Sequence, residues 1–286
     1  YRFNKNKDVR LNLNVMRDQQ TMITEQFALN DNILAITEEK RQGDARLHAL
    51  AMKIEPQFFR APTDNDKSFG NWLAKDWTKH RLDSPRVIRP DENTFIYEFV
   101  NGTIETKREI KTLKDGTLEL EYTFECRGDL PELPRMGVVM KLPKIYSHVS
   151  WYGRGPWENY PDRKTSCHIG RYEDTVANMF THYPRPQDNG NHEDCAEVVI
   201  SKGKHDAVCI TAVDVPFSFS VLPYSAKQLA SLTHDYELPE SDGTYISLDC
   251  AVLVLGNSSC GPGVLKKYAI NKKRNHKLRF RLSNIL

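Results

Sequence analysis

The stretch 151–163, here called the aromatic segment, concentrates side chains that could recognise a sugar: Trp-Tyr-Gly-Arg-Gly-Pro-Trp-Glu-Asn-Tyr-Pro-Asp-Arg. Aromatic rings suit the apolar C–H faces of a pyranose, while carboxylate, amide and guanidinium groups suit its hydroxyls. The glycines and prolines shape the backbone, which predicts a rigid loop at the end of a strand. The candidate sugar-facing or structural residues are Trp151, Tyr152, Arg154, Trp157, Glu158, Asn159, Tyr160, Asp162 and Arg163. The alternative is an aromatic corner that only packs two sheets together.

A second polar stretch, residues 58–66, is here called the acidic segment and ends in Asp64-Asn65-Asp66. Alternating short acids could bind a cation, but this triplet lacks the glycine and the downstream glutamate of a calcium loop. The sequence therefore predicts no metal ligands here.

Four segments, in the same order along the chain, resemble the C-terminal small-chain domain of glycoside hydrolase family 2 β-galactosidases. They are residues 59–66, 151–163, 222–229 and 257–262. The resemblance implies a domain of a retaining enzyme that hydrolyses terminal β-D-galactosides. Its catalytic carboxylates would lie on a barrel domain of typically ~250 residues, a pattern absent from this sequence. We therefore expect no catalytic residue here and no activity from this chain alone; its role would be to complete the active-site wall and to stabilise the assembly.

By the same resemblance, some residues should line the substrate-site wall: Cys260, Ser259, Asp64, Asn65, Asp66 and Phe69. The best-known family members carry a tryptophan that stacks on the sugar at the position of Cys260. A thiol lacks the broad apolar face of an indole, so the aglycone contact should be weaker or come from elsewhere. No histidine is close to Cys260 in sequence, which argues against a nucleophilic role.

The resemblance assigns no cofactor to this chain and places magnesium and sodium sites of the full-length enzyme on other domains. The partners that it implies are a galactoside substrate and the barrel and Ig-like domains of the same polypeptide. It also implies that the full-length form could assemble as a homo-oligomer.

Two other functions are compatible with the residues. The first is a self-sufficient aldose 1-epimerase, which needs a general acid and a general base; His192-Glu193, His182 and His234 are the candidates. The second is a non-catalytic carbohydrate-binding module. Its stacking platform would be Trp151, Tyr152, Trp157 and Tyr160.

The composition excludes several classes of protein. The 286 residues carry a net charge of +2, and no basic run interleaves with aromatics, so no nucleic-acid partner is expected. No apolar stretch is long enough to span a bilayer, and no secretory signal is recognised, which leaves cytoplasm and periplasm both open. Six scattered cysteines without a Cys-x-x-Cys pair argue against a zinc site and a disulfide scaffold.

Apolar and polar residues alternate along much of the chain, as in residues 118–126, which is typical of a strand with one buried face. Asn101-Gly102 separates two such runs and predicts a hairpin. Residues 245–255 form a long apolar run that predicts a buried strand. Because no strand–helix–strand rhythm appears, we predict an all-β fold of antiparallel sheets. The family resemblance makes this a β-supersandwich of the galactose mutarotase type.

One or two short helices should accompany the sheets. The first would follow Ser68, with an apolar stripe at helical spacing that ends at Trp77, and the second would be capped by Ser225. Residues 1–30 would be the tail of a preceding Ig-like domain or entry strands, and residues 31–286 the small-chain domain.

Overall fold

The computed structural model describes residues 45–67, 73–203, 206–255 and 264–285. By its internal contacts the chain divides into two units, Tyr1–Gly43 and Asp44–Leu286, and every described residue belongs to the second. The predicted boundary at residue 30 lies outside the described residues.

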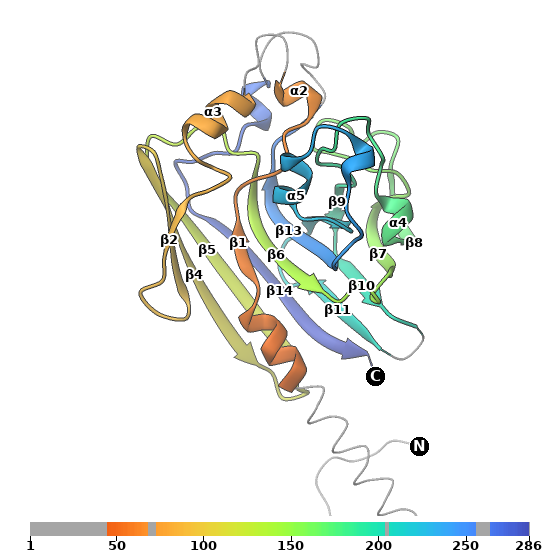
Figure 1. Cartoon of the computed structure of the whole chain (residues 1–286). Helices are drawn as coiled ribbons and strands as arrows, with labels where there is room; N and C mark the ends of the chain where they lie inside the picture. Colours follow the sequence, from red (N-terminus) through yellow and green to blue (C-terminus); the bar gives the residue numbers. More distant parts are fainter. Residues whose placement is uncertain (1–44, 68–72, 204–205, 256–263, 286) are drawn as a thin grey trace, which may run out of the picture. The chain divides into compact units, whose positions relative to one another are not determined.

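The larger of two sheets has nine antiparallel strands in the order β2-β3-β4-β5-β14-β11-β10-β7-β8 (Figure 1). Their bounds are β2 (Arg86–Ile88), β3 (Thr94–Phe99), β4 (Gly102–Thr112), β5 (Leu118–Gly128), β14 (His276–Ile285), β11 (Ala207–Ala212), β10 (Glu197–Ser201), β7 (His148–Gly155) and β8 (His168–Thr175). The predicted hairpin joins β3 to β4, where Asn101 has the positive φ of 73° that tight hairpin turns need.

The smaller sheet has five antiparallel strands in the order β1-β6-β13-β12-β9. Their bounds are β1 (Glu55–Gln57), β6 (Arg135–Leu142), β13 (Thr244–Val252), β12 (Phe217–Leu222) and β9 (His192–Cys195). The long strand predicted at residues 245–255 is β13, which ends three residues earlier than its apolar run. Two antiparallel sheets confirm the predicted all-β class.

Short helices are more numerous than the one or two predicted. They are α2 (Asp64–Lys67), α3 (Leu73–Lys79), α4 (Val176–Met179), α5 (Ala226–Ser231), the 3₁₀ turns η1 (Asp235–Glu237) and η2 (Lys266–Tyr268), and helical residues 45–52. The cap predicted at Ser225 is confirmed, since its hydroxyl accepts from the amide of Gln228 at 3.2 Å. Trp77 of α3 is buried, as its apolar stripe predicted.

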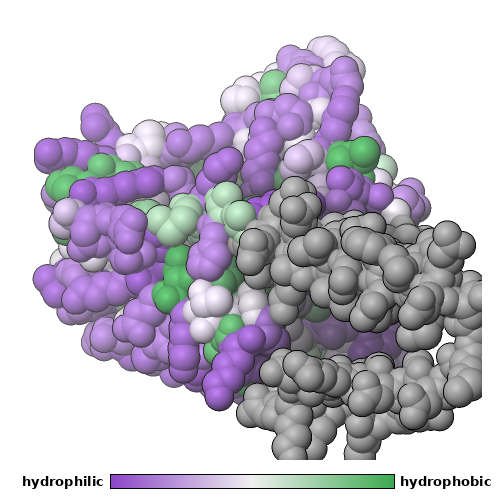
Figure 2. Space-filling model, turned by 90° about the horizontal axis from the view of Figure 1, so that it is seen from below, coloured by the Kyte–Doolittle hydropathy of each residue, from purple (hydrophilic) through white to green (hydrophobic). Residues whose placement is uncertain are grey.

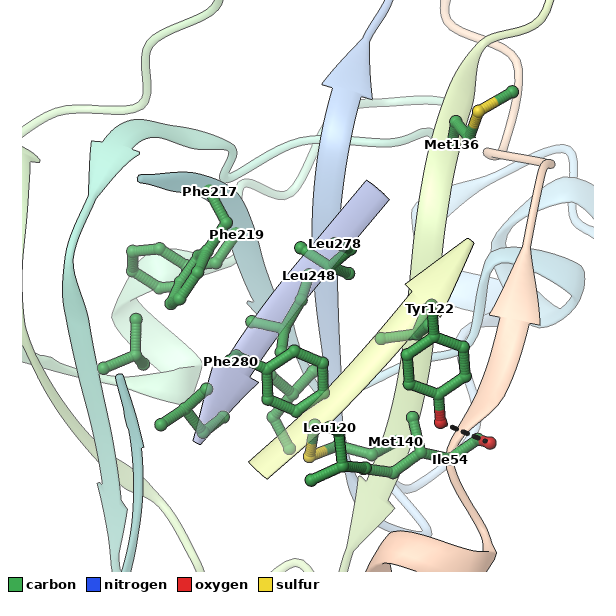
Figure 3. Close-up of a cluster of buried hydrophobic side chains, with 14 of the residues drawn as sticks. Ile54, Leu120, Tyr122, Met136, Met140, Phe217, Phe219, Leu248, Leu278 and Phe280 are labelled. Atoms are coloured by element: carbon green, nitrogen blue, oxygen red, sulfur yellow. Dashed lines mark hydrogen bonds between the residues drawn. The ribbon is translucent and has the colours of Figure 1, made fainter. Parts of the chain in front are cut away.

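The main core lies between the two sheets, as the close-up in Figure 3 shows. Alternating residues of β5 and β14 face alternating residues of the smaller sheet. Examples from the two layers are Leu120, Tyr122, Leu278 and Phe280 on one side, and Met140, Phe219 and Leu248 on the other. The rings of Tyr122 and Phe280 stack with centroids 6.2 Å apart. The two rings belong to neighbouring strands of the larger sheet, and both are part of the core between the sheets.

The opposite face of the smaller sheet is polar and yet buried. On β13, Ile246 and Leu248 belong to the core, whereas Ser247 and Asp249 alternate with them and point to the other face. Asp249 is completely buried. Antiparallel sheets commonly leave their second face to water. Here loops cover it, so the charged groups on this face must find partners within the protein.

Figure 2 shows one face as mainly hydrophilic, with small and separate hydrophobic patches. Within the described part of the chain, no helix is long and apolar enough to cross a membrane.

Replacing Phe280 by alanine should lower the free energy of unfolding by about 3–5 kcal/mol, because it leaves a cavity between the sheets. Phe280→Leu keeps most of the volume and should cost much less. Val215→Ala is the control, since this side chain is 72 % exposed and its loss should stay within about 0.5 kcal/mol. Urea unfolding followed by circular dichroism measures all three, and equal losses for Phe280→Ala and Val215→Ala would contradict this account of the core.

Candidate functional site

A buried ion pair between Arg60 and Asp66 holds the acidic segment in place. Arg60 Nη2 donates to Asp66 Oδ1 at 2.8 Å, and Arg60 Nη1 donates to the carbonyl of Leu253 at 2.8 Å. The amide and the hydroxyl of Thr63 both donate to Asp66 Oδ2, at 2.8 and 2.9 Å. Asp66 was expected on the rim of a substrate site, but it is only 2 % exposed. Its carboxylate neutralises the buried guanidinium of Arg60, so Asp66 has a structural role.

Residues 184–191, here called the bridging loop, attach to the acidic segment. Gln187 Nε2 donates to Asp64 Oδ2 at 3.1 Å, and Gln187 Oε1 accepts from the amide of Asp64 at 3.1 Å. The amide of Asp188 donates to the carbonyl of Ala61 at 3.1 Å. These reciprocal bonds fix the loop against a segment more than a hundred positions earlier in the chain.

The same loop also attaches to the aromatic segment. The amide of Asn159 donates to the carbonyl of Asn191, and Asn191 Nδ2 donates to the carbonyl of Asn159, both at 2.7 Å. Asn159 Oδ1 accepts from the amide of Glu193 at 2.9 Å. Glu158 Oε2 accepts from the amide of Gly190 at 2.8 Å. The carboxylate and the amide that could have bound sugar hydroxyls therefore hold a neighbouring loop.

Arg154 has a similar structural role. Its Nε donates to Asp194 Oδ2 at 2.5 Å and its Nη1 donates to the carbonyl of Cys167 at 2.8 Å. Lys164 Nζ lies 2.9 Å from Asp194 Oδ1 and 3.3 Å from Glu193 Oε2. Asp194 adopts a φ of 54°, a conformation that these ion pairs help to maintain.

The four rings of the aromatic segment do not form a single stacking platform. Trp151 and Tyr160 are 3 % and 0 % exposed, and the ring of Trp151 packs against that of His192 with centroids 4.7 Å apart. Tyr152 and Trp157 are 41 % and 70 % exposed. The platform hypothesis is therefore wrong for Trp151 and Tyr160, which are core residues, while two rings stay accessible.

The remaining predicted site residues are scattered. Asn65 is half-buried and donates to the carbonyl of Leu255 at 2.6 Å. Asp162 is half-buried, and the exposed Arg163 places its guanidinium 5.1 Å from the ring centroid of Tyr160. Three predicted wall residues lie outside the described residues, namely Phe69, Ser259 and Cys260.

The bridging loop contributes Asp188 to a group of polar side chains here called the buried polar layer. Its members are the half-buried Gln57 and the buried Arg135, Asp188, Ser247 and Asp249. Arg135 Nη1 donates to Ser247 Oγ at 3.1 Å and to Gln57 Oε1 at 3.4 Å. Arg135 Nη2 lies 3.4 Å from Asp249 Oδ2, and Nη1 lies 3.9 Å from Asp188 Oδ1. Burial raises the pKa of Asp249 to about 7 and also raises the pKa of Asp188, although Arg135 opposes both shifts.

Sequence reasoning missed this layer, although a signal for it was present. Arg135 stands next to the apolar run of β6, and Asp249 stands inside the apolar run of β13. A charged residue in a strand that is otherwise buried needs a partner, so each position indicated a polar contact across the sheet. A second acid, Asp188, comes from the bridging loop, which no local pattern identifies.

The histidines considered for an epimerase do not gather around one reaction centre. His192 is buried against Trp151 with Nδ1 3.0 Å from the carbonyl of Gly190, and burial lowers its pKa. His182 is exposed and pairs with Asp235 at 2.8 Å. His234 is exposed beside Tyr236, with ring centroids 5.1 Å apart.

In the described part of the chain, the cysteines and acids form neither a disulfide nor a metal site. The cysteines there are free, and no group of three or more His, Cys, Asp or Glu in the described ranges is arranged to hold a metal ion. Burial raises the pKa of Cys126 to about 11, so its thiol stays protonated at neutral pH.

Comparison with known proteins identifies the family. The chain is a two-sheet antiparallel domain with a loop-covered polar face, and the profile described as "Beta galactosidase small chain" matches residues 24–282. The chain therefore belongs to the β-galactosidase small-chain family, as its four segments predicted.

Among its relatives are the β-galactosidase of Staphylococcus xylosus, 33 % identical over 238 residues, and that of Vibrio cholerae, 32 % identical over 228 residues. These matches cover 78 % and 72 % of this chain, but only 23 % and 21 % of the relatives. The chain thus spans less than a quarter of their length. Because the relatives are β-galactosidases, the interpretation as a stand-alone epimerase is wrong.

One solved structure among the matches is a GalM/aldose epimerase homologue from C. elegans. It matches with a TM-score of 0.31 and 9 % identity, over 71 % of this chain and 69 % of that one.

Stability should depend on pH through Asp249. Its pKa is about 7 in the fold and close to 4 in an unfolded chain, so between these values the folded state holds a proton that the unfolded state has lost. The free energy of unfolding should therefore fall as pH rises from 5 to 7, by at most about 3 kcal/mol from this group, and level off above.

Asp249→Asn cannot titrate and should flatten this dependence, leaving the contribution of Asp188, whose pKa is also raised by burial. Asp242→Asn is the matched control, because Asp242 is exposed and its pKa is lowered. Urea unfolding from pH 5 to 8 measures the three proteins. An unchanged slope in Asp249→Asn would refute a raised pKa at this position.

Proposed function

We propose that this chain is the C-terminal domain of a retaining β-galactosidase that hydrolyses terminal β-D-galactosides. The observation that carries the proposal is membership of the small-chain family, with relatives called β-galactosidases that are about four times longer than the matched region. A domain of this size is one part of such an enzyme, and the remaining domains of the same polypeptide are its first partners.

The domain would supply a rigid wall of the substrate site. The acidic and aromatic segments are both tied to the bridging loop, through Asp64–Gln187 on one side and Glu158–Gly190 on the other. Groups fixed in this way lose little freedom when a substrate binds, which is what a site wall requires. Trp157 and Tyr152 remain accessible for contact with a sugar or a neighbouring domain.

The catalytic carboxylates would come from a barrel domain outside this chain. Retaining hydrolysis needs two carboxyl groups about 5–5.5 Å apart on either side of the bond. In this domain Asp66 and Glu158 are already engaged with Arg60 and with the amide of Gly190. Magnesium and sodium would bind on those other domains, and the full-length form could assemble as a homo-oligomer.

The chain alone should not hydrolyse a chromogenic β-galactoside, whereas the same chain joined to the other domains should. A barrel-containing polypeptide that lacks residues 45–286 should be inactive or nearly so, and adding the separate chain should restore turnover. Release of nitrophenol measures all combinations. Turnover by the chain alone that Glu158→Gln abolishes would refute the proposal and place a catalytic carboxylate in the aromatic segment.

The family resemblance also predicts that Cys260 lines the substrate site, which can be tested by substitution. In the full-length enzyme, Cys260→Trp should restore a stacking surface for the aglycone and lower KM several-fold, because an indole buries more apolar area than a thiol. Cys260→Ser is the control and should leave KM nearly unchanged. Equal KM values for all three enzymes would exclude this position from the site wall.

A further inference from the structure

A pocket of about 290 Å³ opens between α5 and the polar face of the smaller sheet, near the lower limit for small-molecule sites. Strands β1, β6 and β13 line one wall, residues 82–87 a second, and the first turn of α5 a third (elements labelled in Figure 1). Its floor is formed by members of the buried polar layer, among them Arg135 and Asp188.

Protein groups leave part of this floor unsatisfied. Arg135 Nε and Asp188 Oδ2 are buried and have no hydrogen-bond partner in the protein, and Arg135 Nη2 makes no hydrogen bond although it lies 3.4 Å from Asp249 Oδ2. Arg135 and Asp188 are only 2 % and 3 % exposed as residues. Buried polar atoms of native proteins almost always have a hydrogen-bond partner. Both side chains border an open pocket, so a small molecule that enters the pocket can be that partner. The floor therefore offers N–H donors and a carboxylate acceptor to a small polar molecule.

The walls combine this polar floor with aromatic surface. Phe59, Tyr224 and Tyr245 line the pocket and are each half-buried, so part of every ring is accessible. Ser247 and Gln57 add a hydroxyl and an amide beside Arg135. Aromatic carbons next to paired donors and acceptors match a molecule that has both C–H faces and several hydroxyls.

The charges that line the pocket favour a neutral ligand over an anion. Arg135 is balanced by Asp249 at 3.4 Å and by Asp188 at 3.9 Å, so the floor carries no excess positive charge. Lys227 on the rim is accompanied by Glu55 and Asp83, which also line the pocket. A sulfate, a phosphate or a sugar acid would therefore gain little here.

We infer that this pocket binds a neutral pyranose, with vicinal hydroxyls on Arg135 and Asp188 and its C–H face against the rings of the wall. The inference concerns sugar binding by this domain itself. It stands on the pocket alone and does not depend on whether the full-length protein hydrolyses β-galactosides.

The test is titration of the 286-residue chain with methyl β-D-galactoside and with D-glucose, followed by saturation-transfer NMR and calorimetry. Ala226→Phe should fill the pocket mouth from the first turn of α5 without touching the polar floor, and should weaken binding at least tenfold. Ala230→Phe is the matched control, since Ala230 is exposed on the same helix and does not line the pocket. It should bind within twofold of the wild type.

Asp188→Asn removes the carboxylate acceptor while keeping the shape, and should weaken binding at least threefold. Thermal unfolding verifies that each variant is folded, so a loss of binding cannot be mistaken for a loss of structure. Absence of binding to the wild type, or equal binding by Ala226→Phe, overturns the inference. Binding of galacturonate or sulfate that Ala226→Phe abolishes, without binding of the neutral sugars, overturns the assigned ligand class.

Discussion

The constraint on which the structure depends is the burial of charged side chains on the outer face of the smaller sheet. A charge in the protein interior is tolerated only when it is paired and hydrogen-bonded. Arg60 meets this requirement through Asp66, whereas Arg135 is paired with Asp249 and Asp188 at 3.4 and 3.9 Å without a hydrogen bond to either carboxylate. Asp188 lies on the bridging loop rather than on the sheet, so its pairing with Arg135 draws that loop to the sheet, while Arg60 attaches the acidic segment to the carbonyl of Leu253. The fold of the loops is thus determined by the sheet beneath them.

This constraint explains why residues that look suited to a sugar serve structural ends. Glu158 and Asn159 have the chemistry of hydroxyl recognition, but they bond to main-chain groups of residues 190–193. A loop without regular secondary structure must satisfy its own amides and carbonyls, and side chains of this type do so at short range. In a loop-rich region, the type of a side chain is therefore a weak indicator of a ligand site. A better indicator is a polar side-chain atom that has no partner within the protein.

Local signals predicted much of the fold. Alternation identified the strands, Asn101-Gly102 the hairpin and Ser225 the cap of α5, because each depends only on neighbours in sequence. The family followed from four segments taken together. Contacts between residues far apart in sequence could not be predicted, and these contacts determine which side chains are buried. Trp151, for example, is buried because its ring packs against those of Phe219 and His192. The polar layer joins residues from four distant parts of the chain, so no window of sequence contains it.

The incomplete hydrogen bonding of Arg135, Asp188 and Asp249 in the polar layer contrasts with the surroundings of Asp66. Leaving a buried donor or acceptor without a partner costs about 1–3 kcal/mol, which is a large share of the stability of a domain. Around Asp66, four donor atoms converge on one carboxylate, two from Arg60 and two from Thr63. The same fold therefore does pair buried charges fully where the cover is closed. At Arg135 and Asp188 the cover is open, and sites that violate a local rule are commonly functional. The polar face thus has two ends. At Asp66 the buried charges hold the domain together, and at Arg135 and Asp188 polar atoms remain free to bind a ligand.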